Sequence, residues 1–533
     1  MGGRVVDGAG NPWFHGDVAI RDERIARVTP AGLLAGARAD LRIDAHGLVV
    51  APGFIDIQSH SRDAFLEGDG RVVSKITQGI TTEIMGEGWT NAPENEHTRG
   101  GTGAIDPSET EREHDFSGPR GFDAWLRAME AHGTSPNIGS FVGATTIRVY
   151  AKGQTRGEAT AADLDTMRAA VRRAMEDGAF GIASALIYPP GNFAGTDELV
   201  EMAEAMAPYG GIYITHMRSE ADAYLDAIDE AIEIAQRAGV PVEIYHLKAA
   251  GQRNWLKADD AIAKIDSARA AGVDVQANMY PYVAGGTGLA AVLPPWASAD
   301  GKLLENLRDP EMRGRIHDDV LADTGEWENL GMQATAEGIV VVGLDDPENA
   351  QWQGARLSEI AADMDEDWVD AAIDLVLSEE GRVGAIFFLM DEPNVALQMR
   401  QPWIKFGTDA GGFDPDSAEG LAHPRAYGTF PRILGKYVRE EGVLPLEDAI
   451  RKMTSAVATR LSIQDRGLVR EGMYADLVVF DPAMIGDRAT FETPHRLSVG
   501  MRHVLVNGVP VVSDGRHTGA KPGRIVRGPG YRP

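Results

Sequence analysis

The stretch Ala51-Pro-Gly-Phe-Ile-Asp-Ile-Gln-Ser-His60 decides the fold, because it joins a short apolar strand to a histidine. In a parallel α/β barrel, the carboxyl ends of the strands meet at one face, and active-site side chains project from them. The stretch therefore predicts the first barrel strand, with His60 in the position of a metal ligand.

Further strands alternate with helices through the middle of the chain, which is typical of βα units and a parallel sheet. The expected strands cover residues 181–187, 211–216, 241–246, 273–279, 383–389 and 404–409. The expected helices cover residues 160–178, 196–209, 220–238, 257–271 and 366–380. A closed eight-stranded barrel over residues 51–464 fits this pattern. Residues 94–120 and 290–350 interrupt it, and we expect a loop insertion and an inserted lid subdomain there.

Short strands also occur at both ends of the chain. Residues 18–28 read as a hairpin, and residues 475–481 and 499–512 are similarly rich in Val and Leu. Because a different pattern lies between them, we expect residues 1–50 and 465–533 to form one small β domain.

The composition limits the classes of function. Of 533 residues, 43% are apolar and the formal charge is −29, so the chain is an ordinary globular one whose surface repels nucleic acid and anionic membranes. There is no Cys, which excludes disulfides and thiol nucleophiles. No run of about 18 apolar residues predicts a membrane span, and no signal peptide is visible. We therefore expect a cytoplasmic protein, although the abrupt start at a strand leaves a trimmed N-terminus open.

Three polar residues end apolar strands in the same way: His216, His246 and Asp409. The two histidines are 30 residues apart, one βα unit, and neighbouring strands lie about 4.8 Å apart, so both imidazoles can reach one metal ion. A single His or Asp at a strand end is as often a cap or a satisfied polar group. Together with His60, the repeated placement favours a metal-dependent active site.

At this point the chain resembles the N-acyl-D-amino-acid deacylases (D-aminoacylases) of the amidohydrolase superfamily. The similar stretches are Pro52-Gly-Phe-Ile-Asp, Gln78-Gly-Ile-Thr-Thr, Leu186-Ile-Tyr-Pro-Pro-Gly, Thr215-His-Met-Arg-Ser-Glu, His246-Leu-Lys-Ala-Ala-Gly, Gly407-Thr-Asp, His423-Pro-Arg-Ala-Tyr-Gly, Met453-Thr-Ser-Ala-Val-Ala and Gly472-Met-Tyr-Ala-Asp-Leu. The resemblance implies a TIM-type (β/α)8 barrel, a β-sandwich made from both termini, and zinc bound by His216 and His246.

The chain departs from the family pattern at two places. The family usually has His-x-His on the first strand and a metal-ligand Cys after the Gly-Ile-Thr-Thr strand. Here the first is Gln58-Ser-His60, and Glu87 follows the second. A carboxylate also binds zinc, whereas an amide is a poor ligand. We therefore expect one tightly held zinc on Glu87, His216 and His246, and weak or no binding of a second ion near His60.

The resemblance also implies the chemistry and the substrate. Asp409 is the expected general acid/base for hydrolysis of an N-acyl-D-amino acid by zinc-activated water. Lys248, Tyr282 and Arg425 are expected to bind the α-carboxylate of this small molecule, and Tyr188 to line the pocket. Ser219 and Glu220 are either outer supports of the site or a helix cap.

Two alternatives stay open. One is another amidohydrolase that acts on dipeptides, cyclic amides or a carboxylate-bearing amide toxin. The other is a non-catalytic scaffold, which only Gln58 and the missing Cys support. The sequence indicates neither the oligomeric state, nor the acyl group, nor the D/L preference.

Overall fold

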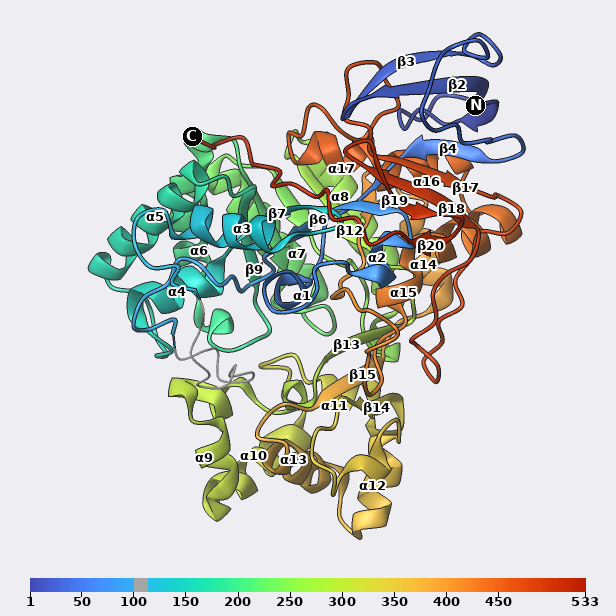
Figure 1. The fold of residues 1–533 in the computed structure, drawn as a ribbon. Helices are drawn as coiled ribbons and strands as arrows, with labels where there is room; N and C mark the ends of the chain where they lie inside the picture. Colours follow the sequence, from blue (N-terminus) through green and yellow to red (C-terminus); the bar gives the residue numbers. More distant parts are fainter. Residues whose placement is uncertain (100–113) are drawn as a thin grey trace.

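A computed structural model describes residues 1–99 and 114–533 of the chain. Figure 1 shows a β domain at one end, a central α/β region, and a smaller group of helices and strands at the other end. The predicted loop insertion at 94–120 lies in part outside the described residues.

The central region is built from parallel strands that belong to two sheets. The three-stranded sheet has the order β5 (Phe54–Asp56), β6 (Ile80–Met85), β7 (Asn137–Ser140). The six-stranded sheet has the order β16 (Ile404–Phe406), β12 (Val275–Met279), β11 (Val242–Ile244), β10 (Ile212–His216), β9 (Gly181–Ala185), β8 (Val142–Gly143). Every pairing within them is parallel, as the βα alternation predicts.

These two sheets adjoin at both of their ends. Only Phe141 separates β7 from β8 along the chain. At the other end, a parallel bridge between Ser59 and Ala410 connects the residues that follow β5 and β16.

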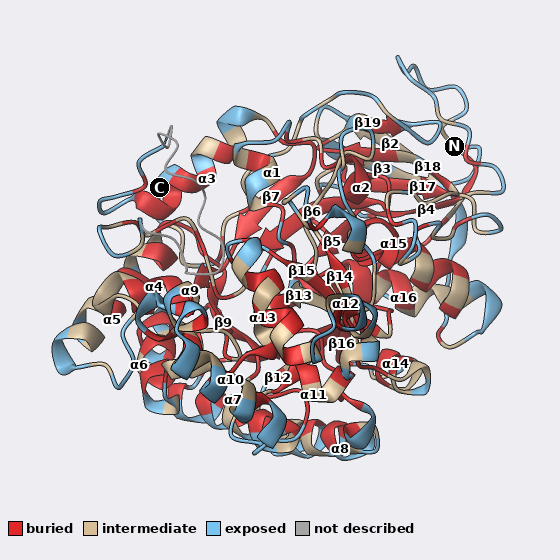
Figure 2. Ribbon diagram, turned by 90° about the horizontal axis from the view of Figure 1, so that it is seen from below, coloured by how far each residue is buried: buried red, intermediate tan, exposed pale blue. Residues whose placement is uncertain are grey.

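Helices cover the outside of the parallel strands. They are α3 (Gly121–His132), α4 (Ala144–Lys152), α5 (Ala161–Glu176), α6 (Thr196–Met206), α7 (Tyr224–Ala238), α8 (Lys257–Ala270), α14 (Glu392–Met399), α15 (Arg425–Arg432), α16 (Leu446–Met453) and α17 (Ser455–Arg460). In α7, Ala227, Ile228, Ala231, Ile234 and Ala235 are buried, which is the spacing of one apolar helix face. Figure 2 shows the strands and the inward helix faces as buried and the outer helix faces as exposed.

Strands from both ends of the chain form a single eight-stranded sheet. Its order is β20 (Arg516–His517), β19 (Val509–Ser513), β18 (Met501–Val506), β17 (Leu477–Phe480), β4 (Val49–Pro52), β1 (Gly3–Val5), β2 (Phe14–Arg21), β3 (Arg24–Pro30). β17 and β4 pair antiparallel, so the C-terminal strands continue the N-terminal ones.

A separate antiparallel sheet lies at the opposite end of the molecule, with the order β13 (Ala284–Gly288), β15 (Gly384–Phe388), β14 (Ile339–Val342). It packs with α9 (Leu303–Arg308), α10 (Pro310–Ala322), α11 (Leu330–Ala334), α12 (Leu357–Met364) and α13 (Trp368–Ser378) around its own apolar core. The inserted region is thus longer than the predicted 290–350.

The sequence prediction was wrong for the strand at 383–389 and the helix at 366–380, which it placed in the parallel alternation. β15 pairs antiparallel with β13 and β14, and α13 belongs to the core of the insertion. A short apolar run predicts a buried strand but not the sheet that it joins, which explains the error.

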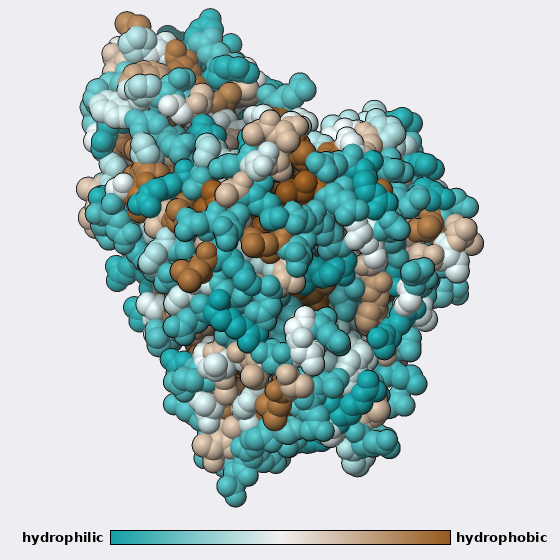
Figure 3. All heavy atoms as spheres, turned by 180° about the vertical axis from the view of Figure 1, so that it is seen from behind, coloured by the Kyte–Doolittle hydropathy of each residue, from teal (hydrophilic) through white to brown (hydrophobic). Residues whose placement is uncertain are grey.

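The surface is mainly polar. Figure 3 shows one face on which hydrophilic residues predominate and hydrophobic residues occur in small groups. Within residues 1–99 and 114–533, no helix has the length and apolar character needed to span a membrane.

Candidate active site

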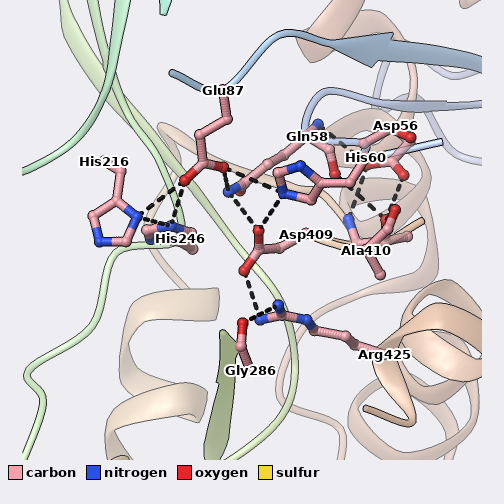
Figure 4. Close-up of polar contacts among 12 residues, drawn as sticks. Asp56, Gln58, His60, Glu87, His216, His246, Gly286, Asp409, Ala410 and Arg425 are labelled. Carbon is pink, nitrogen blue, oxygen red and sulfur yellow. Dashed lines mark hydrogen bonds and ion pairs between the residues drawn. The ribbon is translucent and has the colours of Figure 1, made fainter. Parts of the chain in front are cut away.

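The residues at the carboxyl ends of the parallel strands converge on one place, which Figure 4 shows. Five parallel strands and the residues that follow them supply its polar side chains: Gln58 and His60 after β5, Glu87 after β6, His216 at the end of β10, His246 after β11, and Asp409 after β16. Their convergence follows from the parallel arrangement of the strands.

Glu87, His216 and His246 form the first of two overlapping groups. His216 Nδ1 lies 3.0 Å from Glu87 Oε1, and His246 Nε2 lies 3.4 Å from the same oxygen. The two ring nitrogens are 3.1 Å apart. Two imidazole nitrogens and a carboxylate oxygen that face one another within 4.8 Å are a donor set suited to zinc.

His60, Glu87 and Asp409 form the second group. His60 Nε2 lies 2.9 Å from Asp409 Oδ1 and 3.5 Å from Glu87 Oε2. The side-chain amide of Gln58 donates to both carboxylates, at 2.6 Å to Glu87 Oε2 and 3.0 Å to Asp409 Oδ1. Glu87 thus belongs to both groups. In the second group, the Gln58 amide already forms hydrogen bonds with one oxygen of Glu87 and one oxygen of Asp409.

Two of the three residues in the first group have charge states that suit cation binding, whereas for His246 burial lowers the pKa but the charges of Glu220 and Asp409 raise it to about 9. Burial alone would raise the pKa of Glu87, but hydrogen bonds from His216, His246 and His60 hold it well below its usual range. Burial lowers the pKa of His216, which favours its neutral form. A metal-binding carboxylate must be ionised and a metal-binding imidazole neutral.

Asp409 is ionised as well. Its burial would raise the pKa, but the charge of Arg425 outweighs that effect and lowers it. Arg425 Nη1 lies 2.5 Å from Asp409 Oδ2, and Arg425 Nη2 donates to the carbonyl of Gly286 at 3.0 Å. For His60, burial lowers the pKa, but the hydrogen bonds to Asp409 and Glu87 raise it to about 9.

Glu220 supports the two histidines from their far side. Its Oε1 lies 2.8 Å from His246 Nδ1 and 2.6 Å from Lys248 Nζ, and its Oε2 lies 3.6 Å from His216 Nε2. Burial raises the pKa of Glu220, but the charge of Lys248 and the two histidines lower it strongly. A carboxylate at the outer nitrogen of an imidazole orients the ring that binds a metal with its inner nitrogen.

A cavity of about 230 Å³, the substrate cavity, opens beside this centre. It is lined by His60, Glu87, Ile187, Tyr188, His216, Glu220, His246, Lys248, Tyr280, Gly285, Gly286, Thr287, Leu330, Phe387, Leu389, Asp409 and Arg425. Among the residues that the resemblance assigned to substrate binding, Tyr188, Lys248 and Arg425 line this cavity.

Tyr282, which the resemblance placed at the substrate carboxylate, does not line this cavity, whereas Tyr280 does. β12 ends at Met279, so Tyr280 is the first residue past the strand. The ring of Tyr282 packs edge-on against His423 and Phe491, and its hydroxyl points to the carbonyl of Pro424 at 3.4 Å.

Sequence reasoning did not foresee three contacts of the site. These are the bridging role of Gln58, the place of Tyr280, and the approach of Glu328 from the insertion to the backbone N–H of Glu220, at 3.0 Å. For Tyr280, the position directly after an apolar strand was the available signal. For Glu328, a glutamate in a polar insertion, the sequence offers none.

Comparison with known proteins agrees with this arrangement. Residues 42–512 match the sequence profile described as "Amidohydrolase family". Because the match covers most of the chain, the protein belongs to the amidohydrolase family.

The most similar curated relatives include three proteins from Alcaligenes xylosoxydans xylosoxydans, each 34% identical to the chain. The D-aminoacylase aligns with 98% of this chain and 96% of its own length. The corresponding shares are 98% and 94% for the N-acyl-D-aspartate deacylase and 99% and 95% for the N-acyl-D-glutamate deacylase. The resemblance to the N-acyl-D-amino-acid deacylases is thus confirmed.

Solved structures of such proteins have the same fold. A D-aminoacylase, whose binuclear metal centre is described with one-metal activation and second-metal attenuation, matches with a TM-score of 0.81 and 33% identity. The N-acyl-D-glutamate deacylase of Bordetella bronchiseptica, in complex with zinc and a phosphonate inhibitor, matches with a TM-score of 0.80 and 30% identity. Each alignment covers 99% of this chain and 98% of the other.

Proposed function

We propose that the protein is a metal-dependent hydrolase that cleaves the amide bond of N-acyl-D-amino acids, giving a carboxylic acid and a D-amino acid. One observation carries this proposal. Glu87, His216 and His246 converge beside an ionised Asp409, at a cavity that also holds Lys248 and Arg425. Full-length similarity to three deacylases of N-acyl-D-amino acids supports the choice of substrate.

We infer that the two parallel sheets form one closed (β/α)8 barrel over residues 51–464. The succession of β7 and β8 and the Ser59–Ala410 bridge support this closure. Residues 1–50 and 465–533 are the β-sandwich domain in this proposal, and their shared sheet supports the assignment. The insertion is the lid, and its residues Leu330, Phe387 and Leu389 in the wall of the substrate cavity support that role.

We further propose that one zinc ion is held by Glu87, His216 and His246. When bound, zinc supplies Lewis-acid activation of water and of the amide carbonyl. Gln58 supports the preference for a single ion, because its amide donates to the carboxylates that a second ion near His60 would need. Glu220 lies 2.8 Å from the outer nitrogen of His246 and so fixes the orientation of that ring.

Asp409 is the proposed general acid/base. Its ionised carboxylate accepts a proton from the attacking water and returns it to the amide nitrogen as the C–N bond breaks. His60, which lies 2.9 Å from Asp409 Oδ1, holds the carboxylate in position.

Lys248 and Arg425 are the proposed partners of the substrate α-carboxylate, with Tyr280 and Tyr188 beside them. An Arg fork and a Lys are suited to bind a carboxylate. Arg425 pairs with Asp409 and Lys248 pairs with Glu220, so both cations are held in position at the cavity. The guanidinium of Arg425 also lies 4.8 Å from the ring centre of Tyr280, which limits its movement.

The test is an assay of N-acetyl-D- and N-acetyl-L-amino acids, a dipeptide and a cyclic amide, with metal-free and zinc-reconstituted protein. We expect zinc-dependent hydrolysis of the D-compounds. Hydrolysis of the cyclic amide or dipeptide alone would contradict the proposed substrate. Failure of the folded protein to retain zinc would indicate a scaffold.

Lys248→Ala and Arg425→Ala provide the matched test of the carboxylate contact. Both are expected to raise KM for N-acyl-D-amino acids by at least tenfold, because charge-assisted hydrogen bonds contribute more than about 1.5 kcal/mol. Lys264→Ala, which removes an exposed ion pair between Lys264 on α8 and Asp229 on α7, is the control and is expected to leave KM unchanged. Unchanged KM in the first two variants would exclude these residues from substrate binding.

A further inference from the structure

A second cavity of about 270 Å³, the side cavity, adjoins the reaction centre. It shares His60, Gly286, Thr287, Asp409 and Arg425 with the substrate cavity. Asp409 and Arg425, which are proposed to act on the substrate, therefore lie between the substrate cavity and the side cavity. The two parts of a substrate whose bond is cleaved at Asp409 can each occupy one of these cavities. Figure 4 shows this junction, with Arg425 reaching both Asp409 and Gly286.

The two cavities differ in charge. The substrate cavity contains Lys248 and Glu220 in addition to the shared residues. Among the described residues, the lining that belongs to the side cavity alone is made of Gly, Ala, Val, Ile and Phe, with one histidine, His423.

His423 is neutral in this environment. Its Nδ1 accepts a hydrogen bond from the backbone N–H of Arg425 at 3.0 Å, so that nitrogen carries no proton. Its Nε2 then donates to the carbonyl of Ala284 at 2.8 Å. With both ring nitrogens occupied by backbone, the side cavity presents an apolar surface to a ligand.

The strand β15 divides the two spaces. Ile386 faces the side cavity, whereas the next residue, Phe387, faces the substrate cavity. Successive side chains of a strand point to opposite faces, so one short strand of the insertion supplies a wall to each space.

We propose that the side cavity receives the acyl group of the substrate, and that the enzyme favours linear acyl chains longer than acetyl. This inference rests on the proposed function. Lys248, one of the two cations proposed to bind the α-carboxylate, lines the substrate cavity alone, which leaves the apolar end of the side cavity for the uncharged half of the molecule. An acetyl methyl group leaves most of 270 Å³ unfilled, whereas a chain of four to six carbons buries its methylenes against Val342, Ile386 and Phe413.

The first experiment compares N-acetyl-, N-butanoyl- and N-hexanoyl-D-leucine with the zinc-loaded wild-type protein. Each methylene buried is expected to raise kcat/KM about fourfold until the cavity is full, mainly by lowering KM. A constant or falling kcat/KM from acetyl to hexanoyl would overturn the proposal. Absence of hydrolysis of all three compounds would instead overturn the proposed function itself.

Two matched variants then locate the acyl chain. Ala422→Phe fills the side cavity from a loop, and Ile187→Phe fills the substrate cavity from a loop. Ala422→Phe is expected to abolish the gain from acetyl to hexanoyl, so that kcat/KM for N-hexanoyl-D-leucine falls to the value for N-acetyl-D-leucine. Ile187→Phe is expected to keep the gain with acyl length and to change the preference among D-amino acids.

The reverse result, in which Ile187→Phe removes the dependence on acyl length, would place the acyl group in the substrate cavity and overturn the proposal. An equal effect of Ala422→Phe on all chain lengths would do the same. If Ala422→Phe does not fold, inhibition of the wild-type protein by free hexanoate is compared with its inhibition by free acetate. Stronger inhibition by hexanoate in wild type, retained in Ile187→Phe, supports the side cavity, and equal inhibition contradicts it.

Discussion

Two buried clusters of charged residues stand on the same pair of strands, and only one of them is complete. Glu243 in β11 and Lys405 in β16 form one cluster with Arg460, with Lys405 Nζ 2.9 Å from Glu243 Oε2 and Arg460 Nε 2.9 Å from the same oxygen. His246 follows β11 three residues after Glu243, and Asp409 follows β16 four residues after Lys405. The difference between the clusters lies in how their charges are paired.

In the Glu243 cluster, every charge meets an opposite charge on a side chain. In the active-site cluster, the carboxylates of Glu87, Glu220 and Asp409 lie beside histidines whose ring nitrogens face one another. Among the described residues, a lysine or arginine side chain pairs with only two of these carboxylates, Glu220 and Asp409. A buried cluster completed by its own side chains serves the fold, whereas an incomplete one indicates a bound cation and a reaction. The predictions below test this distinction in order of expected effect.

The largest effect is expected from Asp409→Asn. The amide keeps the shape of the carboxylate but cannot accept the proton of water, so kcat is expected to fall by about 10²–10⁴-fold. The zinc content is expected to stay near that of wild type, because Asp409 is not one of the proposed zinc ligands. A variant that retains more than a tenth of wild-type kcat would remove Asp409 from the chemistry.

Lys405→Met changes the Glu243 cluster, and we expect it to lower the stability of the protein without affecting its activity. It leaves a buried carboxylate with one cation fewer, and breaking such a pair destabilises a protein by about 3–5 kcal/mol. Urea unfolding measures this loss. Zinc content and KM of the folded protein are expected to be unchanged, with Lys264→Met at the exposed pair as the control. Loss of zinc in Lys405→Met would show that the two clusters are not independent.

Gln58→His tests why the active-site cluster binds one ion. The imidazole replaces the amide that now donates to Glu87 and Asp409, and so restores a ligand for a second position. After dialysis against excess zinc, we expect the zinc content to rise from about one ion per chain in wild type towards two in Gln58→His. Gln58→Leu, which removes the amide without adding a ligand, is expected to stay at one. Two ions in wild type would contradict the role given to Gln58.

The smallest effect concerns Glu328, through which the insertion touches the active-site cluster. Its carboxylate accepts hydrogen bonds from Ser219 Oγ at 2.5 Å and from the N–H of Glu220 at 3.0 Å. Burial and the nearby Glu220 charge raise its pKa from 4.5 to about 7, although hydrogen bonding from Ser219 lowers it.

Because the folded pKa is above the unfolded one, the folded state binds more protons between these values, and Glu328 costs stability as pH rises from about 4.5 through 7. Glu328→Gln removes this cost. Its unfolding free energy relative to wild type is expected to increase by on the order of 1–2 kcal/mol from pH 5 to pH 8. Glu326→Gln, at an exposed neighbour, is the control, and a pH-independent difference for Glu328→Gln would contradict the assignment.

The sequence predicted most of the parallel strands and the positions of the polar residues at their ends, because both follow from local patterns. An apolar run that ends in His or Asp predicts that His216, His246 and Asp409 lie at strand ends. Glu87 was predicted from the resemblance, because it follows the Gly-Ile-Thr-Thr strand where the family usually has a metal-ligand Cys. The partner of a strand is a tertiary property, so the antiparallel pairing of β15 was not predictable from its apolar run. The same holds for Tyr280 and Tyr282, since two tyrosines around one Pro look alike until the chain direction after the strand is known.

The backbone at His246 and Asp409 has a consequence for how a cation is received. Both residues have positive φ, 32° and 52°, a conformation that costs on the order of 1–3 kcal/mol for a residue with a side chain. The strands beneath them impose it: the N–H of His246 donates to Asn278 Oδ1, and the N–H of Asp409 to the carbonyl of Gln58. Folding alone therefore preorganises these side chains, and a metal ion arriving later meets them already in place.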